Sequence, residues 1–386
     1  MLIKKTVSLL LCAVMTLCLI TYSVPRAYAA ELDPTSIKAP SALLMDADSG
    51  TVLFDKNSHD IRCCASITKV MTLLLVMEAL DSGKIKLDDI VTSSAHAASM
   101  GGSDIWLEEG ETMSVDDMIK ATAVASANDA AVALAEYICG TEDSFVAEMN
   151  NRAKELGMKD TVFKNCNGLD EEGHVTSAYD VALMSRELIK HKKVLEYTNI
   201  WMDELRDGKT QIVNTNKLLK SYNGITGLKT GTTSQAGACI SATAERDGLS
   251  LIAVVLGCDT GKDRFSDATS ILDYGFANFT SFKPQTPDDL LPELAVTSGM
   301  QNTVKTDCKI TESYICPKGE AESNTYKIAY NDDISAPINK GDVLGKVMYY
   351  SGDKKLGEFD ITAAEDVEEM TFGSVFSLLI NCLFTH

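Results

Sequence analysis

The chain has 386 residues, enough for two or three domains, and an ordinary globular balance of 45% hydrophobic and 23% charged residues. Its formal net charge of -20 argues against a nucleic-acid partner, because nucleic-acid binding requires a basic surface. The same charge says little about small-molecule substrates, since acidity mainly favours solubility.

The first 29 residues have the composition of a secretory signal peptide. Lys4 and Lys5 form a basic start, residues 7–20 are an apolar run, and residues 27–29 (Ala-Tyr-Ala) supply small side chains at a signal-peptidase spacing. We predict cleavage after Ala29, and an uncleaved membrane anchor is the alternative. Either way, the rest of the chain is expected to be extracytoplasmic, secreted or on the outer face of the cell membrane.

The cysteines predict no metal site. Eleven occur, and nine remain after the signal peptide, an odd number that cannot pair completely within one chain. No C-x-x-C pair is present, so neither zinc nor thioredoxin-like chemistry is expected. The disulfide pairing, including a bridge between Cys308 and Cys316, stays open because a reducing habitat would leave thiols.

The predicted elements up to residue 283 form an α+β domain. After an extended lead-in, residues 42–45 and 51–54 predict two strands that flank a turn. The middle of the chain is helical, and a hairpin and a last helix end the domain. The expected helices are 66–80, 114–125, 129–140, 141–156, 178–190 and 266–279, and the expected later strands are 227–231, 238–245 and 249–257. This order predicts an antiparallel sheet with helical layers.

Two further regions follow in the sequence. Residues 284–365 hold short β-like runs separated by turn signals, which predicts a small all-β domain. Residues 366–386 carry one apolar helical stripe, which is too short to span a bilayer. A helix lying in the membrane interface, with contact through 371–384, is one interpretation. The opposite face lacks lysine and arginine, so packing against the protein or a partner is the other.

Ser66 and Lys69 are the first candidate catalytic pair. Residues at i and i+3 share a helix face, so the Lys69 amine can reach the Ser66 hydroxyl. A serine needs a base to become a nucleophile, and burial in an apolar helix lowers the pKa of a lysine until it can act as that base. Alone, S-x-x-K is a common chance match, equally compatible with a capping serine and a surface lysine.

Two later motifs supply complementary groups. Ser126 and Asn128 lie between two predicted helices, where they could relay a proton and orient a substrate, or simply cap a helix. Lys229 ends a predicted strand and offers positive charge to a carboxylate, and a glycine two residues later allows close approach of a substrate backbone. A polar edge strand is the alternative interpretation of this third motif.

The order S-x-x-K, S-x-N and K-T-G is the set found in penicillin-binding proteins and class A β-lactamases. The chain resembles the low-molecular-mass penicillin-binding proteins that are D-alanyl-D-alanine carboxypeptidases, over about residues 36–280. The resemblance also includes residues 41–50, Asn167-Gly168-Leu169-Asp170 and the C-terminal region. It implies a β-lactamase/transpeptidase-like fold with no cofactor or metal.

The resemblance also implies roles for individual residues. Ser66 would form the acyl-enzyme, Lys69 would accept its proton, and Ser126 and Asn128 would assist. Substrate would be bound by the K-T-G strand and by an arginine near the terminal carboxylate, for which Arg264 is the best match and Arg246 the competitor. The substrate-binding set is therefore Lys229, Thr230, Gly231, Thr232 and Arg264. The N–H groups of Ser66 and Thr232 could form an oxyanion hole.

The function expected from these features is removal of the terminal D-alanine from peptidoglycan pentapeptides, with β-lactams as acylating inhibitors. A β-lactamase would also acylate Ser66, but the sequence lacks the E-x-x-L-N segment of class A enzymes. A non-catalytic penicillin sensor or wall-binding protein is the second alternative, which the intact motifs disfavour. A classical triad or metal hydrolase is disfavoured, because the five histidines form no H-E-x-x-H motif and Ser66 has no G-x-S-x-G setting.

Overall fold

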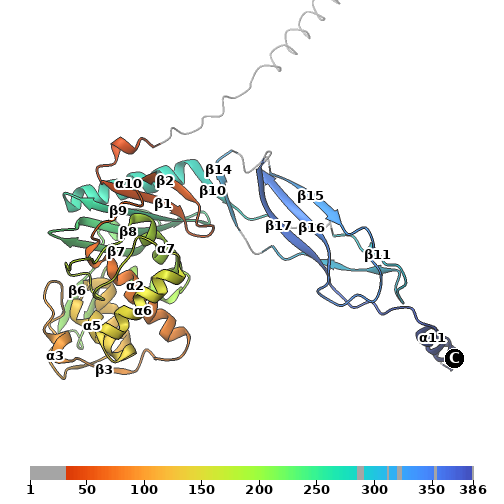
Figure 1. Cartoon of the computed structure of the whole chain (residues 1–386), viewed down its shortest axis with the longest axis horizontal. Coiled ribbons are helices and arrows are strands. Elements are labelled where there is room, and N and C mark those ends of the chain that lie inside the picture. The colour runs from red at the N-terminus through yellow and green to blue at the C-terminus, as the bar shows by residue number, and fades with distance from the viewer. Residues whose placement is uncertain (1–31, 285–290, 311–312, 320–323, 352–353, 385–386) are drawn as a thin grey trace, which may run out of the picture. The chain divides into compact units, whose positions relative to one another are not determined.

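The computed structural model describes residues 32–284, 291–310, 313–319, 324–351 and 354–384. The predicted signal peptide lies outside the described residues. A five-stranded antiparallel sheet with the order β2-β1-β9-β8-β7 organises residues 32–278 (Figure 1). Its strands are β1 (Ser41–Asp46), β2 (Val52–Lys56), β7 (Ile225–Thr233), β8 (Gly237–Arg246) and β9 (Leu249–Cys258). The predicted antiparallel sheet is confirmed.

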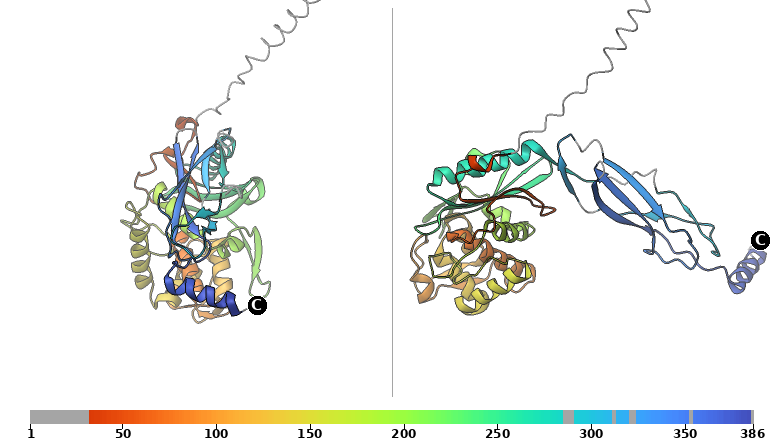
Figure 2. Two further views of the ribbon diagram at one scale, coloured as in Figure 1. Left: turned by 90° about the vertical axis from the view of Figure 1, so that its right-hand side faces the viewer. Right: turned by 45° about the horizontal axis from the view of Figure 1, so that its top comes forward.

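Helices cover both faces of this sheet (Figure 2). The helix α10 (Gly261–Asn278) packs on one face, and α2 (Lys69–Asp81) and α7 (Ala178–Leu188) lie on the other. Alternate residues of β9 enter two separate hydrophobic cores, so that Leu251 faces α10 and Ile252 faces the opposite core. A strand buried on both faces explains why the sequence of β9 is continuously apolar.

The remaining elements of this region add to both layers: the short helical segments at residues 34–36 and 218–221 lie on the side of α10, and most of the others lie on the side of α2 and α7. These remaining elements are η1 (Pro34–Ser36), η2 (Ala65–Thr68), α3 (Ala95–Ala98), α4 (Val115–Lys120), η3 (Ala121–Ala125), α5 (Asn128–Cys139), α6 (Glu142–Glu155), α8 (Lys193–Thr198), α9 (Leu218–Ser221) and the hairpin strands β3 (Ile90–Thr92), β4 (Thr112–Ser114), β5 (Met202–Leu205) and β6 (Thr210–Val213). The side chains of Ser114, Thr141 and Ser177 cap α4, α6 and α7 by accepting backbone N–H groups.

The predicted starts of two helices are wrong. The last helix begins at Gly261 rather than Ser266, because Thr260 caps it by accepting the N–H of Asp263 at 3.1 Å. This places Arg264 in the first turn of α10. The helix predicted over 66–80 begins with the 3-10 turn η2, whose first residue, Ala65, has a left-handed φ of 52°.

The C-terminal region is all β up to its last helix, as predicted. The strand β10 (Phe279–Phe282) pairs with β14 (Tyr314–Pro317), and a four-stranded antiparallel sheet has the order β13-β17-β16-β15. The other strands are β11 (Leu294–Ala295), β12 (Thr303–Val304), β13 (Thr306–Asp307), β15 (Asn324–Tyr330), β16 (Val343–Ser351) and β17 (Lys354–Ala363).

The terminal helix α11 (Phe372–Phe384) exposes part of its apolar stripe. Phe372 is 87% exposed, and Phe376 and Leu379 are each 54% exposed. The rings of Phe372 and Phe376 stack with their centroids 6.0 Å apart. Within the part of the chain that the structure describes, no helix is both long enough and apolar enough to cross a membrane.

Candidate active site

Ser66 lies in the 3-10 turn that leads into α2, half-buried, with Lys69 one turn further along. The Lys69 Nζ lies 3.2 Å from the Ser66 Oγ. The α2 helix is apolar on all sides, so Lys69 is fully buried despite its charge. The predicted pairing of hydroxyl and amine is therefore present in the structure.

Two oxygen atoms besides the Ser66 hydroxyl accept hydrogen bonds from the Lys69 amine. These are the Asn128 Oδ1 at 2.5 Å and the main-chain carbonyl of Asn167 at 2.7 Å. Burial lowers the pKa of Lys69 from its ordinary value of 10.5 to about 7, against smaller effects of Cys166 and Asp129 in the opposite direction. At neutral pH a large fraction of this amine is thus unprotonated and able to accept a proton.

Ser126 and Asn128 flank the join between the π-helical segment η3 and α5. Ser126 has a left-handed φ of 62°, and its buried Oγ has no hydrogen-bond partner among the described residues. Asn128 is oriented by its Nδ2, which donates to the Gly101 carbonyl at 2.6 Å, so that Oδ1 faces Lys69. An unpartnered buried hydroxyl at a strained position is typical of a functional residue.

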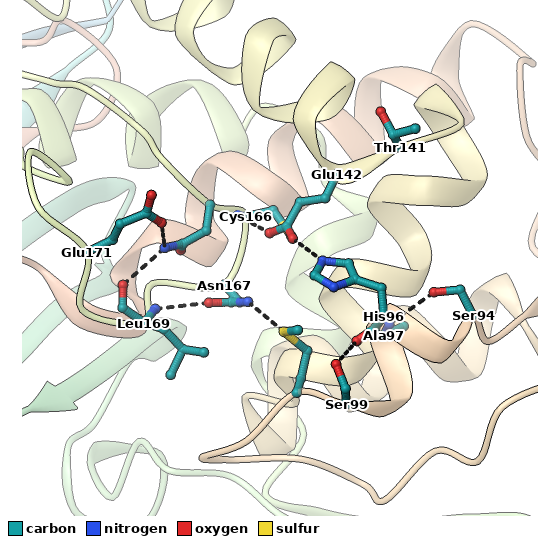
Figure 3. A network of polar contacts seen from close by, with 12 residues as sticks. Ser94, His96, Ala97, Ser99, Thr141, Glu142, Cys166, Asn167, Leu169 and Glu171 are labelled. Atoms are coloured by element: carbon teal, nitrogen blue, oxygen red, sulfur yellow. Dashed lines mark hydrogen bonds and ion pairs between the residues drawn. The ribbon is translucent and has the colours of Figure 1, made fainter.

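The loop of residues 165–170 lies directly against the turn that carries Ser66. Gly168 has φ of 86°, and a Cβ atom there would lie 2.0 Å from the Ala65 carbonyl oxygen. At the other end of this loop, Asp170 accepts a hydrogen bond from the Thr233 Oγ1 at 2.6 Å. The loop therefore joins the nucleophile turn to the end of β7. Figure 3 shows other polar contacts of this loop, including that of Cys166 with Glu142 and that of Asn167 with Leu169.

The strand β7 brings Lys229 and Thr230 to the site. Lys229 is 1% exposed and donates to the Thr230 carbonyl at 3.0 Å. Burial, followed by the charges of Lys69 and Arg264, lowers the pKa of Lys229 well below its ordinary value. Thr230 is fixed by its Oγ1, which donates to the Thr215 Oγ1 at 2.6 Å.

Arg264 reaches the end of the same strand from α10. Its Nη1 contacts the Gly231 carbonyl at 2.9 Å, the Thr232 Oγ1 at 3.1 Å and the Cys239 carbonyl at 3.1 Å. Its buried Nε has no partner among the described residues. Gly231 approaches the Ser66 turn so closely that a Cβ atom would lie 2.8 Å from the Ser66 nitrogen. These contacts link eight of the nine predicted residues, and the ninth, Ser126, lies two residues before Asn128.

Arg246, the competing candidate, is held elsewhere. Its Nε donates to the Asn223 carbonyl at 2.9 Å, and its guanidinium lies over the rings of Tyr222 and Phe276. It therefore has a structural role at the turn between β8 and β9.

Two contacts at the site were not predicted from the sequence. The Asn167 carbonyl on Lys69 is a main-chain group, which no side-chain pattern identifies, although the Asn-Gly-Leu-Asp motif marked this loop. The second is a chain of contacts beneath Ser66. His174 Nδ1 accepts the Lys164 N–H at 3.1 Å, so its Nε2–H donates to the Thr68 Oγ1 at 2.8 Å, and Thr68 donates to the Ala65 carbonyl at 2.9 Å.

A serine hydroxyl beside a buried lysine amine, within this layered fold, defines a serine hydrolase of the penicillin-binding class. A model of the family "D-alanyl-D-alanine carboxypeptidase" (peptidase S11) matches residues 27–260, and "Penicillin-binding protein 5, C-terminal domain" matches residues 279–369. The chain belongs to the S11 family of D-alanyl-D-alanine carboxypeptidases. The expected family, fold class and type of enzyme are confirmed.

Individual relatives cover between 62% and 96% of the chain. The D-alanyl-D-alanine carboxypeptidase DacF of Bacillus subtilis (strain 168) is 42% identical over 377 residues, 96% of each chain. The structure of penicillin-binding protein 5 from Haemophilus influenzae covers 88% of this chain and all of its own, with a TM-score of 0.76 and 33% identity. Penicillin-binding protein D2 from Listeria monocytogenes, bound to ampicillin, covers 62% of this chain and 98% of its own, with a TM-score of 0.58 and 35% identity.

Proposed function

We propose that this enzyme removes the terminal D-alanine from peptidoglycan stem pentapeptides through an acyl-enzyme on Ser66. One observation carries the assignment of the nucleophile: a fully buried lysine amine, with a pKa of about 7, lies 3.2 Å from the Ser66 hydroxyl. This arrangement supplies the base that a serine needs, without a histidine.

In the proposed acylation step, the Ser66 Oγ attacks the carbonyl carbon of the penultimate D-alanine, and the Lys69 amine takes the hydroxyl proton. The bond to the terminal D-alanine nitrogen then breaks, and that nitrogen receives a proton through the Ser126 hydroxyl. The N–H groups of Ser66 and Thr232 stabilise the oxyanion. Water hydrolyses the resulting ester in the second step, with Lys69 again accepting a proton.

The terminal carboxylate of the substrate is the proposed ligand of the cationic groups at β7. The guanidinium of Arg264 and the amine of Lys229 converge on the segment Thr230 to Thr232, which offers hydroxyl groups to the same carboxylate. Lys229 and Arg264 lie close enough for their charges to interact, and an incoming carboxylate would relieve that repulsion.

The proposal is tested with a diacetyl-Lys-D-Ala-D-Ala peptide and with penicillin. We expect release of D-alanine and a stable penicillin adduct on Ser66 by mass spectrometry, with both absent in Ser66→Ala. Rapid turnover of penicillin without release of D-alanine would instead identify a β-lactamase. A stable adduct with no hydrolysis of the peptide would indicate the penicillin sensor.

We further propose a location and an organisation for the whole chain. A signal peptide of residues 1–29 would direct export, followed by a catalytic domain over 30–283, a β-rich domain over 284–365 and an anchoring helix within 366–386. The exposed rings of Phe372 and Phe376 support contact of 371–384 with a membrane surface. Deletion of residues 370–386 should release the protein from membranes, and unchanged partitioning would reject the anchor.

A further inference from the structure

Three histidines of the described structure pair with a carboxylate: His59 with Asp160, His96 with Glu142, and His191 with Asp81. The pair formed by His96 and Glu142 is connected to the active site by further hydrogen bonds. His96 comes from the short helix α3, and Glu142 from the first turn of α6 (Figure 3). The Nε2 of His96 lies 2.7 Å from the Oε2 of Glu142.

Glu142 uses its second oxygen to hold the loop beneath the site. Its Oε1 accepts the backbone N–H of Cys166 at 3.0 Å. Burial raises the pKa of Glu142, but the hydrogen bonds from Cys166 and His96 outweigh burial and leave this pKa below its ordinary value. Glu142 is therefore a carboxylate at neutral pH, and it binds the loop through a charge-assisted hydrogen bond.

The Cys166–Asn167 segment connects this carboxylate to the catalytic helix. The Cys166 carbonyl accepts the Thr72 Oγ1 at 2.5 Å, and the next carbonyl along the chain, that of Asn167, accepts the Lys69 amine at 2.7 Å. Displacement of the Cys166 N–H from Glu142 would therefore move an acceptor of Lys69.

His96 is linked indirectly to Asn128, the other acceptor of Lys69, through the segment that follows its own helix. The chain that leaves α3 passes through Gly101, whose carbonyl orients the amide of Asn128, and the Asn128 Oδ1 accepts the Lys69 amine. The contacts thus form a closed ring from His96 through Asn128, Lys69 and the loop of residues 165–170 back to Glu142.

We propose that His96 and Glu142 form a positioning pair that fixes both oxygen acceptors of the Lys69 amine, and so keeps this amine directed at the Ser66 hydroxyl. This inference rests on the proposed function of Lys69 as the base. Neither His96 nor Glu142 touches the reacting atoms.

Loss of either oxygen acceptor of Lys69 should change the pH dependence of acylation. Both acceptors favour the charged form of Lys69, so their loss lowers its pKa and lets the amine turn away from Ser66. The titratable groups that face the pair and the amine are the thiol of Cys166, the carboxylate of Asp129 and the amine of Lys229. Of these three, the Cys166 thiol is influenced by Glu142, which adds to burial in raising its pKa; because burial is the larger cause, the thiol stays uncharged at neutral pH in the Glu142 variants.

The experiment measures the second-order rate constant for acylation by penicillin between pH 5 and pH 9. In Glu142→Ala and His96→Ala we expect a plateau roughly tenfold lower, together with a midpoint shifted to lower pH. Glu142→Gln, whose amide oxygen can still accept the Cys166 N–H, should recover most of the plateau. His191→Ala provides the matched control, because its partner Asp81 lies at the far end of α2.

A second measurement separates this proposal from the proposed function. Titration of the Lys69 side chain by NMR in lysine-labelled protein, assigned with Lys69→Arg, reports its pKa whether or not Ser66 is acylated. A wild-type enzyme that is not acylated would overturn the proposed function alone. A lower free energy of unfolding with an unchanged Lys69 titration, or an equal shift in His191→Ala, would overturn the positioning role.

Discussion

The amide oxygen of Asn128 accepts a hydrogen bond of 2.5 Å from the Lys69 amine, while the amide nitrogen of the same residue donates to the Gly101 carbonyl. Asn128 therefore cannot rotate without losing one of the two contacts. Lys69 is in this way held by residues on a separate helix, and its geometry depends on the packing of α5 against α2 as well as on its own helix.

Acylation by penicillin should follow the deprotonation of Lys69. Because the pKa of this amine is lowered to about 7, the rate should level off above that pH and fall about tenfold per pH unit well below it. Stopped-flow measurement of the acylation rate between pH 5 and pH 9 checks this. A profile that is flat over this range would contradict Lys69 as the base, and Lys69→Met should slow acylation at least about 100-fold.

Gly168→Ala should displace the loop that packs against the turn carrying Ser66. The new Cβ would lie 2.0 Å from the Ala65 carbonyl, and the backbone φ of 86° disfavours any side chain. We expect a loss of about 3 kcal/mol in the free energy of unfolding, together with slower acylation. Gly110→Ala is the matched control: its φ is 79° with no atom within 4 Å, so its cost should be about 1 kcal/mol, without an effect on acylation. Equal effects of the two variants would refute the close packing at Gly168.

Arg264→Gln should act on substrates that carry a free C-terminal carboxylate. We expect a loss of about 2 kcal/mol in transition-state binding, or roughly 30-fold in kcat/KM, for a peptide acid, and a much smaller loss for the corresponding peptide amide. The kinetics of both peptides with the purified variant check this. Arg246→Gln should leave both substrates unaffected, and equal losses on acid and amide would assign Arg264 a purely structural role.

His174 should make the enzyme acid-sensitive. Burial lowers its pKa from 6.5 to about 4, so the unfolded chain binds a proton between these values that the folded chain does not. Stability is therefore complete above pH 6.5 and falls as the pH drops towards 4, by about 3 kcal/mol for this group. Urea unfolding of wild type and His174→Gln at pH 7 and pH 4.5 measures the difference, and an equal loss in both proteins would exclude His174 as its source.

Much of the fold could be predicted because local signals are strong in it. The apolar runs on either side of the turn at Asp247 predict β8 and β9 to within one residue at each end, and Thr141 marks the start of α6. The strand order could not be predicted, because the pairing of β1 with β9 joins segments that share no local pattern. The start of α10 was missed because Thr260 and Asp263 cap it within a polar stretch without apolar periodicity.

The residues of the site likewise fall into those that could be predicted from the sequence and those that could not. Side chains with distinctive chemistry, such as Ser66, Lys69 and Lys229, could be predicted from motifs that each occupy one stretch of chain. The carbonyl of Asn167 and the contact of Glu142 with Cys166 could not, because they depend on where a loop folds in space. Arg264 was already the better match by resemblance, and the tertiary contacts separate it from Arg246.

The pairing of Ser41 with Leu256 joins the first strand of the central sheet to the last one in the chain. A nascent chain that is exported from its N-terminus, as proposed here, cannot complete its central sheet until β9 has emerged. Until then Ser66 has no β7 beside it, since β7 is held in the sheet through β8 and β9. Distant pairings of this kind form late in folding. On the proposed export route, Ser66 and β7 are therefore brought together only after most of the catalytic region has been translocated.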